Sequence, residues 1–299
     1  MRVSALITDS LSVTLRHRAL WVFGLFAAAG GGASGSVNTD SQGQEAGAAQ
    51  DLPESLAGLA SAAEHMGAVV AAHLPLVMGG AAVLGLGMIA LHILSEGALI
   101  EGVSRLHRRP TEAFTVRRGV RLGLGHFGVV LSIKVLALAL GLLLASLVAA
   151  PFALAGLGAL PTAAALALGM PLMVAAVPAG ISLYLIYALG MRVAVLENRR
   201  AFDALGRARR LLHGRLLDGL KLMLTVGLGR MGAGFLVLPA VLPVLAAAGL
   251  GYLLGGLVGA LVALVALAVP LALLAGGVLG TWQSSVWTLG YLATVEDAR

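Results

Sequence analysis

Residues Arg192–Lys221 read RVAVLENRRAFDALGRARRLLHGRLLDGLK and form the longest charge-rich segment of the chain, with long apolar stretches before and after it. At 100° per residue, apolar side chains fall on one stripe of a helix: Phe202, Leu205, Ala208, Leu212 and Leu216. Polar side chains, mostly arginine, fall opposite: Arg199, Arg200, Asp203, Arg207, Arg210 and Asp218. The segment is therefore predicted to be an amphipathic helix on the membrane surface between two spanning helices.

The composition of the whole chain agrees with a membrane protein. Of 299 residues, 59% are hydrophobic and 11% are charged, and the mean hydropathy is +0.96. A soluble domain is about a quarter charged, and apolar runs of 18 or more residues need lipid around them. We expect an all-α, polytopic transmembrane helical bundle, with residues 1–299 as a single integral membrane domain. The chain has no cysteine, which excludes disulfides and thiolate metal sites.

The apolar runs predict about six spans, with interfacial amphipathic helices between them. The runs are Ala19–Ala33, Leu74–Ile100, Leu124–Ala150, Ala163–Leu189 and two within Leu222–Gly280, with a turn near Gly249–Gly251. The first run also fits a signal peptide that is cleaved, because a basic segment precedes it and small residues follow it. Retention as a first span and removal as a signal peptide both remain open.

The distribution of basic residues predicts the orientation. Residues 34–73 contain no Lys or Arg, whereas residues 105–121 contain six Arg and one acidic residue. Positive loops stay in the cytoplasm, so 34–73 is expected to be extracytoplasmic, 105–121 and 192–221 to be cytoplasmic basic amphipathic segments, and both termini to be cytoplasmic. The Arg, Ala, Gly and Leu bias favours a bacterial cytoplasmic (inner) membrane. The net charge of +6 is spread over short loops, so no nucleic-acid partner is expected.

Prolines and aromatic residues add details that the structure can test. Prolines remove a helical hydrogen bond, so Pro151 is expected to end the third span, and kinks or interruptions are expected at Pro171, Pro178, Pro239, Pro243 and Pro270. Aromatic rings with a polar tip prefer the membrane interface. On that basis Trp282, Trp287 and Tyr291 are placed at interfacial depth.

Ionisable residues gather near the predicted inner ends of the spans: His92, Glu96, Glu101, Lys134, Arg192, Glu197 and Arg230. Ionisable groups within a membrane are functional candidates by default. Structural pairing among them and a proton or ion path are the two interpretations. Lys134 is close enough to the inner interface to extend its ammonium toward it. No catalytic set, cofactor-binding motif or metal-ligand spacing is present, so no catalytic, cofactor or metal residue is expected.

Glycine spacing predicts close helix packing. Gly251, Gly255 and Gly259 form a ridge on one face of the predicted sixth helix, and such ridges let helices cross closely. Packing within the chain and packing between chains both remain open. Gly227, Gly229 and Gly232 match a dinucleotide-binding fingerprint by letters, but no strand precedes them, so helix packing is the favoured interpretation.

Part of the basic segment resembles a known family. Its residues are Arg192, Val195-Leu196-Glu197, Ala201, Ala204, Arg210-Leu211-Leu212 and Gly214, together with a basic N-terminal segment before Trp21. They resemble a motif of bacterial six-helix membrane proteins of unknown function, which are similar to the membrane domain of some glycerophosphodiester phosphodiesterases. Ala194 stands where that family often has proline, and Arg209 where it often has serine. These 299 residues leave no room for a phosphodiesterase domain, so the resemblance is expected to imply a fold and not an activity.

These observations predict a non-catalytic membrane protein that acts through lipids or a protein partner. Arg199, Arg200, Arg207 and Arg210 are the candidate contacts to anionic headgroups on the cytoplasmic side or to a partner; the plainer interpretation is that their charges only set the topology. A homo-oligomer is a further expectation. The alternative function is a transporter or permease for a small molecule or lipid, because prolines interrupt several predicted spans.

Overall fold

The computed structural model describes residues 3–32, 73–109 and 111–296, and every element in these ranges is an α-helix. The helices are α1 (Val3–Arg16), α2 (Ala19–Gly32), α4 (Leu74–Arg108), α5 (Val116–Gly156), α6 (Thr162–Leu196), α7 (Ala201–Leu212) and α8 (Leu216–Glu296). The all-α prediction is confirmed. The predictions for 34–73 lie outside the described residues, apart from His73.

Helix α8 is two antiparallel arms joined by a sharp turn at glycine. Its backbone leaves helical dihedral angles at Gly255 (φ −142°, ψ 21°) and Gly256 (φ 59°, ψ −149°). A Cβ atom at Gly251 would touch the backbone of Gly259, and a Cβ at Gly259 would touch Gly251. The predicted turn at Gly249–Gly251 is therefore wrong. The predicted ridge of Gly251, Gly255 and Gly259 on one helix face is wrong as well. Gly251 and Gly259 face each other across the turn within one chain.

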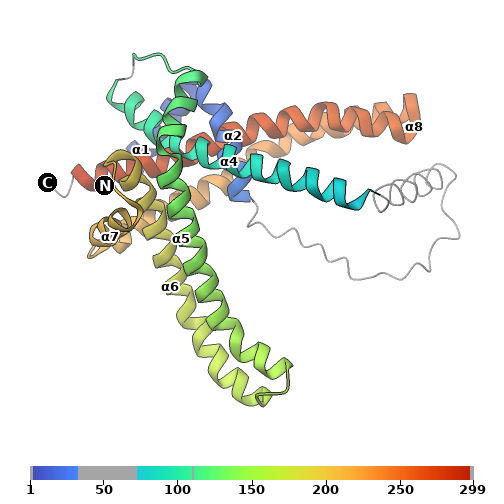
Figure 1. Cartoon of the computed structure of the whole chain (residues 1–299). Helices are drawn as coiled ribbons and strands as arrows, with labels where there is room; N and C mark the ends of the chain where they lie inside the picture. The colour runs from blue at the N-terminus through green and yellow to red at the C-terminus, as the bar shows by residue number, and fades with distance from the viewer. Residues whose placement is uncertain (1–2, 33–72, 110, 297–299) are drawn as a thin grey trace, which may run out of the picture.

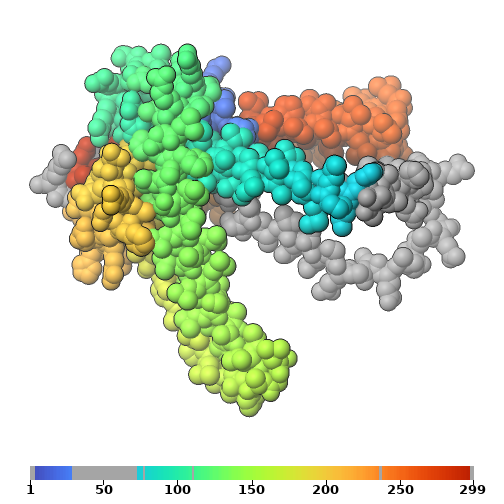
Figure 2. Space-filling model, viewed as in Figure 1, coloured from blue at the N-terminus to red at the C-terminus, as the bar shows by residue number. Residues whose placement is uncertain are grey.

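A helical core carries three projections (Figure 1). They are the first half of α4, the hairpin formed by α5 and α6, and the hairpin formed by the two arms of α8. The core contains α1, α2, α7 and the remaining ends of the longer helices, with fully buried side chains such as Leu20, Ile100, Ile133 and Trp287. The α5–α6 hairpin leaves this core in a different direction from α4 and the α8 hairpin (Figures 1 and 2).

The projections expose large apolar side chains that need lipid around them. Leu76 is 77% exposed, Val174 70% and Leu254 89%. Each such side chain left in water forgoes about 1.5–3 kcal/mol of burial free energy. Among the described residues, four helices are long and apolar enough to cross a membrane: α4, α5, α6 and α8. The structure thus supports a membrane-embedded protein with several apolar helices, and α2 adds a shorter apolar helix.

Prolines do not interrupt these helices. Pro151 lies inside α5, which continues to Gly156, and Pro171 and Pro178 lie inside a continuous α6. In α8 the backbone breaks at Gly255 and Gly256 rather than at its three prolines. The predicted end at Pro151 and the predicted interruptions are therefore wrong, and the kinks expected at the other prolines stay a prediction. Membrane-type helices tolerate proline because neighbouring groups and small local adjustments compensate for the missing hydrogen bond.

Glycines bring α2 directly onto the return arm of α8. A Cβ atom at Gly280 would touch the carbonyl oxygen of Gly24, and one at Gly24 would touch the carbonyl oxygen of Gly277. The hydroxyl of Thr281 donates a hydrogen bond across this contact to the carbonyl of Leu20, at 3.0 Å. Contact between backbones at this distance requires glycine, and here it fastens the N-terminal helices to the last helix.

The aromatic residues of the return arm are buried in the protein. Trp287 and Tyr291 are 2% exposed and Trp282 is 8% exposed. The indole of Trp282 packs on Gly229 of the first arm, where a Cβ atom would overlap the ring. These rings fill spaces between helices, which the amino-acid type alone does not reveal, and their interfacial depth stays a prediction.

Helix α7 packs against the core, and its apolar face is covered by the protein. It buries Ala204, Ala208, Leu211 and Leu212, whereas Phe202 is 76% exposed. Leu205 packs on Gly190 of α6. The predicted stripe through Phe202 and Leu216 is thus rotated from the buried face. The small side chains of Ala204 and Ala208 allow α7 to approach α6 closely, and that contact determines which face of α7 is buried.

Candidate functional site

A cavity of about 270 Å³ lies where the projections join the core, and we refer to it as the polar pocket. Its lining comes from α2, α4, α5, α6 and both arms of α8. Five of the ionisable residues selected from the sequence line it together: His92, Glu96, Lys134, Arg192 and Arg230. Residues more than a hundred positions apart therefore meet at one place.

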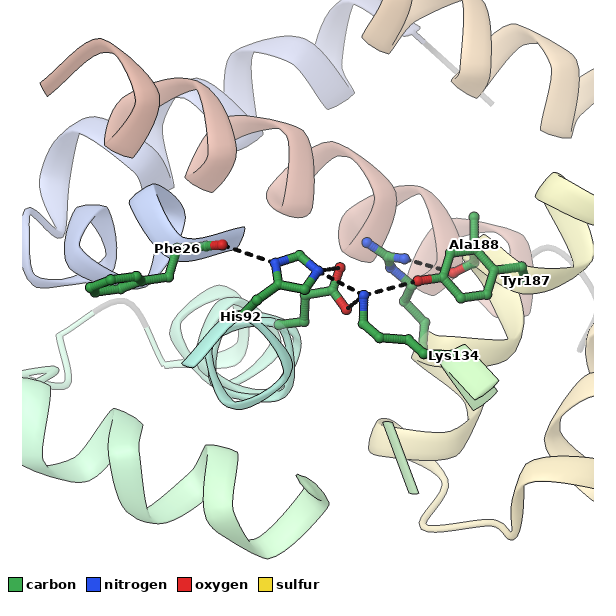
Figure 3. Close-up of polar contacts among 7 residues, drawn as sticks. Phe26, His92, Lys134, Tyr187 and Ala188 are labelled. Carbon is green, nitrogen blue, oxygen red and sulfur yellow. Dashed lines mark hydrogen bonds and ion pairs between the residues drawn. The ribbon is translucent and has the colours of Figure 1, made fainter. Parts of the chain in front are cut away.

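Lys134 ties three helices together in this pocket (Figure 3). Its ammonium lies 2.7 Å from a carboxylate oxygen of Glu96, 2.8 Å from Nε2 of His92 and 3.3 Å from the hydroxyl of Tyr187. The contacts with His92 and Tyr187 are hydrogen bonds, and the contact with Glu96 is an ion pair. Lys134 therefore points toward partners inside the protein, and its approach to the inner interface stays a prediction.

The hydrogen bonds of His92 specify its protonation. Nδ1 lies 2.9 Å from the carbonyl oxygen of Phe26, which can only accept, so Nδ1 carries the proton. Nε2 then accepts from the ammonium of Lys134. The ring links α2 to the cluster on α4 and α5 (Figure 3).

The guanidinium of Arg192 lies at the pocket, and most of its N–H donors have no acceptor among the described residues. Its Nη1 donates to the carbonyl of Ala188 at 2.7 Å, and the guanidinium carbon lies 5.9 Å from the centroid of the Trp287 ring. Its Nε is buried and has no hydrogen-bond partner among the described residues. A guanidinium carries five N–H donors and strongly favours planar oxyanions. No carboxylate in the described part of the chain pairs with Arg192.

Arg230 reaches the same pocket from the first arm of α8. It is exposed and has no hydrogen bond or ion pair within residues 3–32, 73–109 and 111–296. With His92 neutral, the lining carries three cations and one carboxylate, a formal charge of +2. Glu96 pairs with Lys134 and also attracts Arg192, so the excess of two positive charges is shared by the three cations of the pocket.

The pocket marks the boundary between charged and uncharged helix. No Asp, Glu, Lys or Arg occurs from Val135 to Met191, or from Met231 to Val295. The charge-free part of α5, Val135–Gly156, measures roughly 33 Å at 1.5 Å per residue. The hydrocarbon core of a bilayer is about 30 Å thick. The last charges before each uncharged hairpin therefore converge in the polar pocket.

Two of the selected ionisable residues lie elsewhere. Glu101 pairs with Arg105, one turn further along α4, at 2.7 Å. Glu197 lies at the end of α6, where one carboxylate oxygen is 2.7 Å from Arg199 and the other accepts from the hydroxyl of Tyr291 at 2.7 Å. Arg207 approaches Glu197 at 3.9 Å. This second cluster fixes the connection between α6 and α7 onto α8.

The four candidate lipid contacts of the basic segment thus divide into two pairs. Arg199 and Arg207 lie beside Glu197. Arg200 and Arg210 are exposed and make no hydrogen bond or ion pair with any other described residue. Arg200 and Arg210 are the arginines of this set whose charge is available to a membrane surface.

Several pocket residues were not selected from the sequence. Tyr187 accepts from Lys134, Trp287 packs under Arg192, and Gln283 and Ser284 contribute neutral polar groups. The signal was present in the run TWQSSVWT, residues 281–288, which is unusually polar for an otherwise apolar arm. The role of this run depends on which face of the helix meets Arg192, and the neighbouring sequence does not specify that.

Among the described residues, no group of three or more His, Asp or Glu side chains is arranged to hold a metal ion. No family model matches the chain, and neither a curated protein nor a solved structure matches it. The site therefore has to be interpreted from its own chemistry.

Proposed function

We propose that this chain is a non-catalytic, multi-pass membrane protein that acts by binding anionic lipid at the cytoplasmic face of a bacterial inner membrane. The proposal includes binding of a protein partner, or of a second copy of the chain, at the same face. The observation that carries it is the convergence of Arg192 and Arg230, beside the ion pair of Lys134 with Glu96, at the foot of two uncharged hairpins. Cationic side chains at that depth meet the phosphate layer of a leaflet.

The proposed topology has six spans, formed by α2, α4, α5, α6 and the two arms of α8. Both termini are cytoplasmic, because the charged ends of the helices belong to the core and cytoplasmic loops carry the excess of Arg. The resemblance of the basic segment to the membrane domain of some glycerophosphodiester phosphodiesterases stays a prediction; it implies the same six-helix layout.

Lipid retention by the full-length protein tests this function. We would reconstitute it in nanodiscs of phosphatidylcholine with a minor fraction of phosphatidylglycerol and identify retained lipids by native mass spectrometry. Enrichment of phosphatidylglycerol around the protein is expected. Each basic residue near an anionic surface contributes about 1 kcal/mol, so the double change Arg200→Gln and Arg210→Gln should reduce the enrichment by about tenfold or more.

The matched control keeps both charges. Arg200→Lys with Arg210→Lys should retain the enrichment, because a general attraction to anionic headgroups depends on charge and not on the shape of the guanidinium. Equal retention of phosphatidylcholine and phosphatidylglycerol by the unmodified protein would contradict the proposed function.

A transporter is the second candidate, and the cluster of His92, Glu96 and Lys134 favours it. Protonatable groups that join different helices inside a membrane protein are typical of proton relays. Uptake of radiolabelled inorganic phosphate into proteoliposomes, lost on Glu96→Gln, would support this function. Glu101→Gln is the control, because Glu101 lies on the same helix but outside the polar pocket.

A further inference from the structure

We propose that the polar pocket is a binding site for a phosphate monoester dianion, held by Arg192 and Arg230. This inference rests on the proposed function, because it assigns a ligand class to the site at which anionic lipid would bind. The ligand is either the headgroup of a phosphatidate-type lipid or a free phosphate compound. Both present the same terminal phosphate with three acceptor oxygens.

The first argument is the unmet hydrogen-bonding capacity of Arg192. One N–H donates to Ala188, Nε is buried without a partner among the described residues, and the aromatic ring of Trp287 lies against the guanidinium. A buried charged donor without an acceptor is unfavourable, and an acceptor supplied by a ligand removes that penalty. The fork of a guanidinium binds two oxygens of one phosphate at once.

The second argument is that Lys134 is not available to a ligand. Its ammonium already forms an ion pair with Glu96 and hydrogen bonds with His92 and Tyr187. Lys134 and Glu96 therefore act as a neutral unit that positions the helices around the pocket. The charge left for a ligand is that of two arginines.

The third argument is charge balance. A phosphate monoester carries −1.5 to about −2 charges near pH 7, because its second pKa is about 6. A phosphodiester, as in phosphatidylglycerol, carries one charge and leaves one arginine unmatched. Two free guanidinium groups around a cavity of about 270 Å³ therefore favour the monoester.

Neutral donors complete the site on the side of the return arm of α8. Gln283 and Ser284 line the pocket, and neither makes a hydrogen bond to another described residue. Ser284 is 8% exposed and lines the pocket. An amide and a hydroxyl beside two guanidinium groups supply donors for the remaining phosphate oxygen.

The position of the pocket allows a lipid to enter from the side. The exposed residues of the lining, Tyr184 and Arg230, belong to the α5–α6 hairpin and to the first arm of α8. These two hairpins diverge from the core (Figure 1). A headgroup held by the arginines would therefore have its acyl chains beside apolar helix surfaces.

The experiment compares lipids that differ in phosphate charge. The full-length protein is placed in phosphatidylcholine nanodiscs that contain equal minor amounts of phosphatidate and phosphatidylglycerol, and retained lipids are counted by native mass spectrometry. Phosphatidate should be retained at least about tenfold over phosphatidylglycerol, since a charged hydrogen bond contributes a factor of this order. The single changes Arg192→Gln and Arg230→Gln should each abolish that preference.

The control removes two positive charges outside the polar pocket, one more than each single variant. Arg117 and Arg121 are exposed, lie outside the pocket and pair with no described residue, so Arg117→Gln with Arg121→Gln should keep the preference for phosphatidate. Arg230 is a surface residue, so Arg230→Gln tests the site even if Arg192→Gln fails to fold.

Inorganic phosphate distinguishes the two sources of the ligand. If millimolar phosphate displaces phosphatidate from the unmodified protein and raises its thermal midpoint, and neither effect occurs in Arg230→Gln, the site accepts a free phosphate compound. If phosphate does neither while phosphatidate is retained, the ligand is the lipid. Equal retention of phosphatidate and phosphatidylglycerol, with both above phosphatidylcholine, would overturn the monoester site and leave the proposed function standing. Retention of neither would overturn both.

Discussion

Replacing Lys134 by methionine is the most informative single change, because one ammonium joins α4, α5 and α6. The change removes the partner of Glu96 at 2.7 Å and the donors to His92 and Tyr187. Removing one member of a fully buried ion pair costs about 3–5 kcal/mol, and of an exposed pair at most about 1 kcal/mol. The side chains of Lys134 and Glu96 are 21% and 23% exposed. We therefore expect Lys134→Met to lower the free energy of unfolding by about 2–3 kcal/mol.

The assay is unfolding in detergent micelles with increasing dodecyl sulfate, followed by tryptophan fluorescence. Trp282 and Trp287 are buried in the core, so their emission reports its loss. Glu96→Gln should be destabilising by itself, and the double variant should be less unstable than the sum of the two single variants, with a coupling of about 1.5 kcal/mol.

An exposed ion pair of the same type provides the control. Lys221 lies 3.2 Å from Asp218, with side chains 60% and 37% exposed. Lys221→Met should change the free energy of unfolding by less than about 0.5 kcal/mol. Strict additivity of Lys134→Met and Glu96→Gln, or equal effects at Lys134 and Lys221, would refute the reasoning that the pocket cluster braces the three helices.

Three further changes test the packing. Gly280→Val should lower the thermal midpoint strongly, because the new side chain meets the backbone of α2 and overpacking costs about 1–3 kcal/mol or more. Gly227→Ala is the control: its new side chain faces open space, so the midpoint should stay nearly unchanged. Gly256→Ala places a Cβ at φ 59° and ψ −149°, so it should destabilise the tip of the α8 hairpin by about 1–3 kcal/mol, seen as faster amide exchange there; unchanged exchange would contradict the turn. Tyr291→Phe removes a 2.7 Å hydrogen bond to Glu197 and should cost about 1–2 kcal/mol in chemical unfolding, and an unaltered midpoint would show that the bond does not form.

The helices were predictable from the sequence because lipid imposes a simple requirement. A stretch that is apolar over 20 residues and must satisfy its backbone hydrogen bonds internally becomes a helix. Their ends were less predictable. The predicted second span stops at Ile100, where charges begin, but α4 continues to Arg108. Hydropathy detects the part of a helix that lipid surrounds, and these helices continue into a protein core.

The site was predictable as a set of residues and not as an arrangement. The rule that ionisable groups in membrane segments carry function selected His92, Glu96 and Lys134. The sequence could not indicate that Lys134 turns inward, because its three acceptors lie 38 to 53 positions away in the chain. It could not indicate that Arg192 rests on Trp287 either. Such contacts depend on which faces of the helices meet, and small residues such as Gly190 and Gly229 decide this.

The divergence of the two hairpins has a mechanical consequence. A flat bilayer has one normal, and each hairpin carries more than roughly 30 Å of charge-free helix. In a membrane both hairpins must turn toward that normal, and they adjust their tilt to its thickness. Lys134 and Arg192 move with the α5–α6 hairpin, and Arg230 moves with α8. We therefore expect the separation of the two arginines to vary with the thickness of the surrounding bilayer, which would make the membrane a determinant of the width of the pocket.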